Sequence, residues 1–84
     1  MNENRTALME RAAIRLLGDR RFCAHALARR GQLDFQRVAT LLECDRGTAA
    51  QIALSDRPRT AADLARLAEI CRIDPKRLRR ALGE

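Results

Sequence analysis

The sequence predicts an all-α protein, a compact bundle of about six short helices that contains a helix-turn-helix. Fifteen alanines and twelve leucines supply most of the apolar residues, and small and branched side chains of this kind suit closely packed helices. The only aromatic residues are two phenylalanines, whereas strands favour aromatic and β-branched side chains. Apolar residues also recur at helical spacing between capping residues and glycines. The 84 residues are therefore expected to form one domain, residues 1–84.

Each expected helix begins at a capping side chain or ends near a glycine. The expected helices are residues 3–17, 20–30, 35–43 and 46–55, a fifth after Thr60 and a sixth from Pro75. The expected N-caps of the second to sixth helices are Asp19, Asp34, Asp45, Thr60 and Asp74. The expected buried stripe of the fifth helix is Leu64, Leu67, Ala68, Ile70 and Cys71.

Residues 35–54 are typical of two helices joined by a tight turn, as in a helix-turn-helix. Small or apolar residues share one face of each helix, and Ala39 lets the two backbones approach closely. The turn requires a left-handed backbone at Glu43, where glycine is usual and a residue with a β-carbon costs about 1 kcal/mol. A packed helical hairpin without a role in DNA binding is the alternative interpretation.

From Asp19 onward the chain resembles the phage-repressor (Xre-like) DNA-binding domain. The resemblance rests on the helix pair, on the basic loop Arg57-Pro58-Arg59-Thr60, and on residues 64–74, which are similar to the family's fourth helix and following turn. It implies a helix-turn-helix bundle over residues 19–83 and an added N-terminal helix over residues 1–17. A second resemblance, carried by residues 30–35 and the leucine-rich helix pair, is to an uncharacterised alphaproteobacterial helical family, and it implies an interaction module.

The chain carries a net charge of +6, and all but one of its 17 basic residues are arginine. For so small a domain this charge indicates an anionic partner, nucleic acid first. A GC-rich coding sequence, in which arginine replaces lysine generally, is the alternative explanation.

The resemblance implies that the helix over residues 46–55 enters the major groove of double-stranded DNA. Its expected outward residues are Asp45, Arg46, Gly47, Ala50, Gln51 and Leu54. Among them Arg46 and Gln51 are the expected base contacts, because Arg reads guanine and Gln reads adenine. The expected contacts to the DNA backbone are Thr40, Thr48, Arg57, Arg59, Lys76 and Arg77.

The first helix is the expected homodimer element, because its apolar residues exceed what one bundle can cover. Leu8, Ala12 and Leu16 are expected to form the dimer face, while Ile14 and Leu17 face the bundle. Double-stranded DNA and a second copy of the chain are thus the expected partners. Neither a membrane contact nor a small-molecule substrate is expected.

An enzyme, a metal site and a cofactor are not expected. One serine, one histidine and four isolated glycines supply neither a catalytic triad nor a phosphate-binding loop. Cys23, Cys44 and Cys71 form no C-x-x-C pair, so they are interpreted as buried thiols. No signal-like segment or long apolar run is present, which predicts a cytoplasmic protein. The predicted function is a small DNA-binding protein, sequence-specific or architectural, that regulates transcription; the alternative is a helical protein-protein interaction module.

Overall fold

The described part of the chain folds into six helices that follow one another with short connections. The computed structural model describes residues 2–83, with side chains from residue 4 onward. The helices are α1 (Asn2–Arg15), α2 (Cys23–Leu27), α3 (Phe35–Leu42), α4 (Arg46–Ala53), α5 (Ala61–Cys71) and α6 (Pro75–Ala81). The predicted all-α fold is confirmed. The Cα radius of gyration, 11.5 Å, is close to the value of about 12 Å expected for a compact chain of this length.

Four of the predicted N-caps are confirmed by hydrogen bonds. The side chains of Asp34, Asp45, Thr60 and Asp74 each accept a hydrogen bond from a backbone amide in the first turn of the helix that follows. The shortest of these bonds, 2.7 Å, joins the Thr48 amide to Asp45. Each bond satisfies one of the amides that a helix leaves free at its start, so local chemistry fixes where α3 to α6 begin.

The prediction for the second helix was wrong at both ends. The helix is five residues long, and its N-cap is Phe22, not Asp19. Phe22 is extended because it forms an antiparallel bridge with Asp56, so the helix starts only after it. At the other end Ala28 is extended, and Arg30 and Gly31 then form a two-residue turn with φ of 54° and 74°. Pairing with a distant loop therefore overrides the local capping signal of Asp19.

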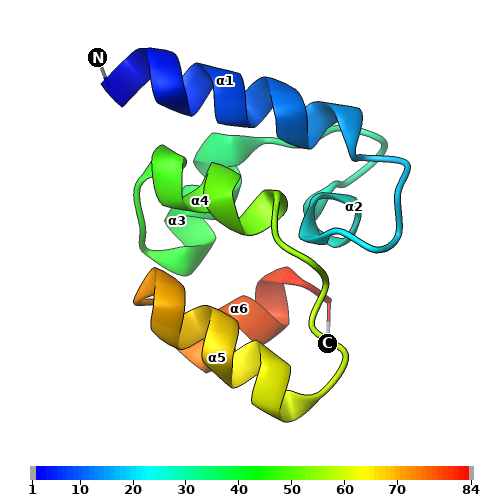
Figure 1. Cartoon of the computed structure of the whole chain (residues 1–84), viewed down its shortest axis with the longest axis vertical. Coiled ribbons are helices and arrows are strands. Elements are labelled where there is room, and N and C mark those ends of the chain that lie inside the picture. Colours follow the sequence, from blue (N-terminus) through cyan, green and yellow to red (C-terminus); the bar gives the residue numbers. More distant parts are fainter. Residues whose placement is uncertain (1, 84) are drawn as a thin grey trace.

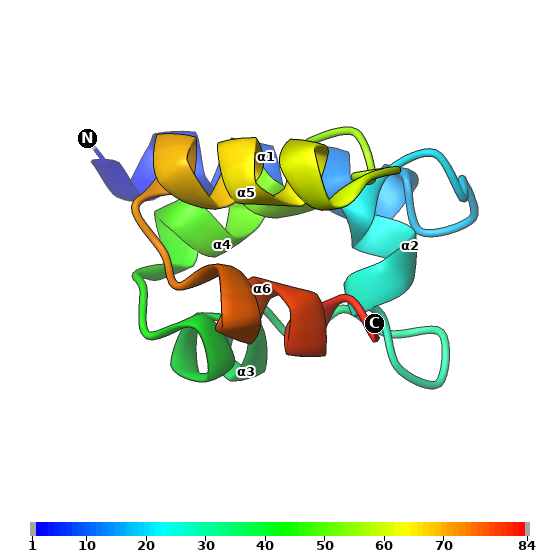
Figure 2. The same cartoon turned by 90° about the horizontal axis from the view of Figure 1, so that it is seen from below.

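Helix α4 is the central element of the bundle. It contacts α1, α2, α3 and α5. Figure 1 shows α1 crossing above α4, with α5 and α6 below it, and Figure 2 shows α4 between the level of α1 and α5 and that of α3 and α6. Four of its eight residues, Ala49, Ala50, Ile52 and Ala53, are completely buried. A helix of small residues suits this place because four neighbouring helices must approach it closely.

The core otherwise follows the predicted stripes, with one error in α5. Leu64 and Ala68 are buried, and Leu67 and Cys71 pack against the core, but Ile70 is 65% exposed. Residues on a helix are about 100° apart, which places Ile70 about 120° from Leu64 around the helix axis. Ile70 therefore lies outside the stripe that the other four residues share.

The left-handed turn predicted between the two helices is present. Glu43 ends α3 with φ 54° and ψ 47°, and its amide bonds back to carbonyl groups of α3. Its carboxylate pairs with Arg77 of α6 at 3.0 Å. This ion pair is exposed, so it offsets little of the backbone cost.

Within the described residues, the structure contains no helix that is both long enough and apolar enough to cross a lipid bilayer.

Candidate nucleic-acid interface

Helix α1 covers the face of α4 that was expected to meet DNA. Ala50, predicted to point outward, is completely buried, so that prediction was wrong. Gly47 lies against α1, since a β-carbon built on it would be 3.3 Å from the Thr6 hydroxyl oxygen. Leu54 is half-buried and packs against the core. The contact is close because α4 presents glycine and alanine to α1.

The two expected base contacts lie at the edges of this covered face. Arg46 forms an ion pair with Glu10 of α1, with both guanidinium–carboxylate hydrogen bonds between 3.0 and 3.1 Å. Gln51 is exposed on the next turn of α4. The guanidinium of Arg46 already has an acceptor, and Gln51 sits on a helix between α1 and α5 (Figure 1).

The expected backbone contacts fall into two groups. Arg57 and Arg59 follow α4, and neither forms an ion pair with another described residue. The remaining four are distributed over α3, α4 and α6, and are Thr40, Thr48, Lys76 and Arg77. In that group the Thr40 hydroxyl donates to the Gln36 carbonyl at 2.9 Å, and Arg77 pairs with Glu43. Arg57, Arg59 and the exposed Lys76 are therefore the expected contacts whose charge has no ion-pair partner among the described residues.

Helix α1 is rotated about its own axis relative to the prediction, so that different side chains face the bundle. Its buried side contains Ala13, at 0% exposure, with Met9 and Leu16 packed against the core. Leu8 and Ala12 are exposed, but Leu16 is half-buried, so the three do not form one free face. Ile14 was expected to face the bundle and is 49% exposed, because it lies about 100° around the helix from Ala13. Homodimerisation through α1 stays a prediction.

Most of the net positive charge of the chain lies at one end of the molecule, which we call the basic end. It consists of the connections over residues 16–22, 28–32 and 54–60, the first residues of α5 (61–63), and residues 79–82 at the end of α6. The two views agree that these segments lie at the end where α2 closes the bundle (Figures 1 and 2). They contain eight arginines against three aspartates, a net +5 out of the +6 of the whole chain. The eight are Arg20, Arg21, Arg29, Arg30, Arg57, Arg59, Arg79 and Arg80.

The arginines of the basic end are largely without carboxylate partners. Of the eight, only Arg21 forms an ion pair with a described residue, its neighbour Asp19 at 2.9 Å. The other two ion pairs of the described structure, Arg46–Glu10 and Arg77–Glu43, lie outside the basic end. Away from this end acidic and basic side chains nearly balance, so the protein's field is concentrated on one surface.

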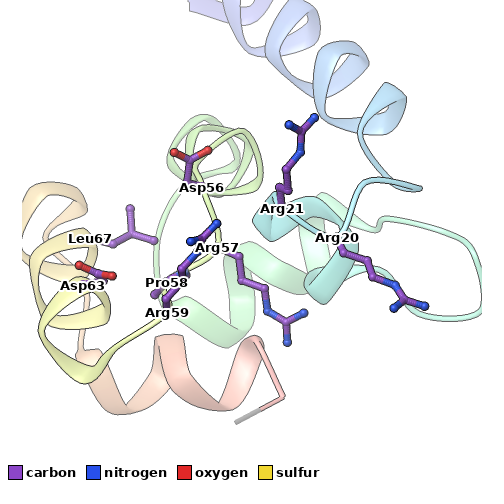
Figure 3. Close-up of a pocket in the computed structure, with 8 residues that line it drawn as sticks. All are labelled: Arg20, Arg21, Asp56, Arg57, Pro58, Arg59, Asp63 and Leu67. Carbon is purple, nitrogen blue, oxygen red and sulfur yellow. The ribbon is translucent and has the colours of Figure 1, made fainter.

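An open groove runs across the basic end between the turn before α2, the α4–α5 loop and the first turns of α5 (Figure 3). Pro58, which is buried, and Leu67 line its apolar part. Its charged lining residues are Arg20, Arg21, Asp56, Arg57, Arg59 and Asp63. A groove with four guanidinium groups and two carboxylates favours an anionic ligand.

Backbone hydrogen bonds hold the two arginine-bearing segments of the groove together. The Arg57 amide donates to the Arg21 carbonyl at 2.7 Å, and the Cys23 amide donates to the Ser55 carbonyl at 2.9 Å. The Cys23 thiol also lies 3.6 Å from the Asp56 carbonyl. Segments more than 30 residues apart in the chain are thus joined, which brings Arg20 and Arg21 beside Arg57.

Asp19, which does not line the groove, neutralises Arg21, which does. The guanidinium and amide of Arg21 both donate to the Asp19 carboxylate at 2.9 to 3.3 Å. These hydrogen bonds lower the pKa of Asp19 to about 2, so it stays ionised near neutral pH. Arg21 therefore contributes less free positive charge than Arg20, Arg57 or Arg59.

None of the three cysteines forms a disulfide bond among the described residues. Cys23 is buried, and burial raises the pKa of the half-buried Cys44 and Cys71. A raised pKa keeps both thiols protonated, which makes them poor nucleophiles. No group of three or more potential metal ligands occurs among the described residues.

Comparisons with protein-family models, with curated proteins and with solved structures find no match to this chain.

The sequence held a signal for the basic end that was not used. Three Arg-Arg pairs, residues 20–21, 29–30 and 79–80, occur at turns or helix ends, and Arg57 and Arg59 flank a proline in a fourth such place. The concentration of arginine in the connections was therefore the available clue, whereas which connections share one end depends on how the helices pack.

Proposed function

We propose that this protein is a small DNA-binding protein that holds double-stranded DNA by its phosphate backbone, with the basic end as the contact surface. The observation that carries the proposal is the concentration of net charge, +5 of +6, in four segments of which seven arginines have no ion-pair partner among the described residues. A composition effect alone would distribute arginines over the whole surface. Free guanidinium groups gathered on one surface are what phosphate binding requires.

Backbone binding fits the structure better than base reading by α4. A recognition helix must project from the surface to enter a major groove about 12 Å wide. Helix α4 instead lies at the centre of the bundle, where Ala50 is completely buried and Arg46 is paired to Glu10 of α1. We therefore favour an architectural DNA-binding protein over a sequence-specific one. Its role in transcription would then result from binding the DNA backbone and not from reading the base sequence.

The alternative, a protein-interaction module, has weaker support. Such modules usually expose a contiguous apolar patch. The large exposed apolar side chains here, Leu8, Ile14, Leu41 and Ile70, belong to three different helices, and Leu8 and Ile14 lie on different sides of α1.

Binding to a fluorescent 20-base-pair duplex of arbitrary sequence, measured by anisotropy at several salt concentrations, tests the proposal. With four to six phosphate contacts, affinity should fall roughly 10²- to 10³-fold between about 50 and 200 mM salt. Duplexes of unrelated sequence should bind within about threefold of each other, because backbone contacts carry no base information. As a control, Gln51→Ala should leave the affinity unchanged, since Gln51 lies outside the basic end.

Absence of binding at the lowest salt concentration, or affinity that does not respond to salt, would refute the proposal and favour the interaction module. Strong preference for one duplex, lost in Gln51→Ala, would instead restore base reading by α4.

A further inference from the structure

We propose that the groove formed by Arg20, Arg57 and Arg59 is a phosphodiester-binding site that seats one DNA strand, while the other arginines of the basic end only add diffuse attraction. This inference rests on the proposed function and assigns its anchoring site. Arg20 was not among the residues that the sequence indicated, and the structure brings it beside the loop of Arg57 and Arg59.

Within the groove, Arg57 differs from the arginines outside it in how it is held. The loop that carries Arg57 is fixed by the amide bond to the Arg21 carbonyl and by the buried Pro58 beside it. Arg57 itself is half-buried. Ordering a side chain on a fixed, partly covered backbone costs less entropy on binding than ordering a fully solvated one. A phosphate placed there also interacts across a less polar medium than water, which strengthens the attraction.

The remaining pairs lack such a setting. Arg29 and Arg30 are exposed, Arg29 just before and Arg30 within the turn formed by Arg30 and Gly31, and Arg79 and Arg80 are exposed at the C-terminal end of α6. None of these four residues lines the groove. They raise the local concentration of DNA, as any exposed positive charge does.

The shape of the groove matches a polymer strand better than a small anion. It is open, and its apolar part, Pro58 and Leu67, lies beside the charged residues. A strand offers phosphates to the arginines and deoxyribose carbons to the apolar part. Asp56 and Asp63 lie in the same lining and disfavour a phosphate placed on their side, so they restrict the path of the strand.

Three double variants, each of which removes two positive charges, distinguish a specific phosphodiester site in the groove from attraction by all exposed arginines alike. They are Arg20→Gln/Arg59→Gln in the groove, Arg29→Gln/Arg30→Gln on the turn, and Arg79→Gln/Arg80→Gln on α6. All six side chains belong to exposed residues, so each variant should fold, and circular dichroism with thermal unfolding verifies this. Affinity for the same 20-base-pair duplex is measured over a series of salt concentrations.

The groove variant should lose at least about tenfold more affinity than either control, and its slope of log K against log salt should fall by about 1.8, or 0.9 for each lost contact. Each control should change the slope by less than about 0.5. Equal losses in all three variants, with a wild-type protein that still binds, would overturn the groove site and leave the proposed function intact. A wild-type protein that does not bind the duplex would overturn both.

If the double variant in the groove is destabilised, the same comparison is made with two single variants, Arg59→Gln in the groove and Arg30→Gln outside it. Each lies on an exposed connection and removes one charge. A larger loss of affinity and of salt slope for Arg59→Gln supports the site, and equal losses contradict it.

Discussion

Ile52→Ala is expected to lower the free energy of unfolding by about 3 kcal/mol, within the range of roughly 2–5 kcal/mol for large-to-small changes in a core. Ile52 is completely buried in α4, the helix that contacts four others, so its loss leaves a cavity that no single neighbour can fill. A domain of this size has a total stability of about 4–12 kcal/mol. Urea unfolding followed by circular dichroism measures the difference.

The matched control is Ile70→Ala, the same chemical change at a residue that is 65% exposed. It should alter stability by less than about 1 kcal/mol, because little apolar surface returns to water. Similar losses for the two variants would mean that α4 is not the centre of the core.

Ala50→Leu is expected to destabilise the protein by about 2 kcal/mol, because a larger side chain must force α1 away from α4 or strain the contact. Ala50 is completely buried, and the neighbouring Gly47 already lies against Thr6. The adjacent change Gln51→Leu, at an exposed residue, should stay within about 0.5 kcal/mol of the wild type. Thermal unfolding of both variants in the same buffer gives the comparison.

A stable Ala50→Leu protein would indicate that α1 does not rest on this part of α4 in solution. The face of α4 would then be free for DNA, as the sequence interpretation expected. The variant therefore bears on function as well as on packing.

The sequence was sufficient for features that local chemistry decides. Asp34, Asp45, Thr60 and Asp74 cap helices because a side-chain oxygen meets free amides within a few residues. Glu43 adopts the left-handed conformation that the spacing of the two helices required. Such features depend on neighbours in the chain, so they can be predicted without knowing the packing.

Features decided by distant contacts could not be predicted in the same way. Asp19 is a plausible cap, but the bridge between Phe22 and Asp56 keeps the backbone extended and delays α2. The orientation of α1 depends on Gly47 and Ala50, more than 30 residues away, and no periodicity within α1 indicates it. The position of a residue around the helix axis also decides its burial more than its hydrophobicity does. Ala13 is buried and Ile14 is exposed, although only about 100° around the axis separates them.

The same reason limited the prediction of the candidate site. Arg57 and Arg59 were singled out because they sit in one loop, which is a local feature. Their association with Arg20 results from backbone hydrogen bonds across the bundle. Residues that act together on one surface but come from separate connections become apparent only when the ends of the helices are placed in space.

The central claim is that DNA contacts the basic end and leaves α4 beneath α1. The most direct test is a titration of the ¹⁵N-labelled protein with a duplex of arbitrary sequence, in which the change in each amide chemical shift is measured by NMR. We expect the largest changes at residues 19–22 and 56–60 and smaller changes at residues 29–32, with Ala50 and its neighbours in α4 nearly unchanged. The largest changes at Thr48, Ala50 and Gln51, together with changes along the buried side of α1, would contradict the claim.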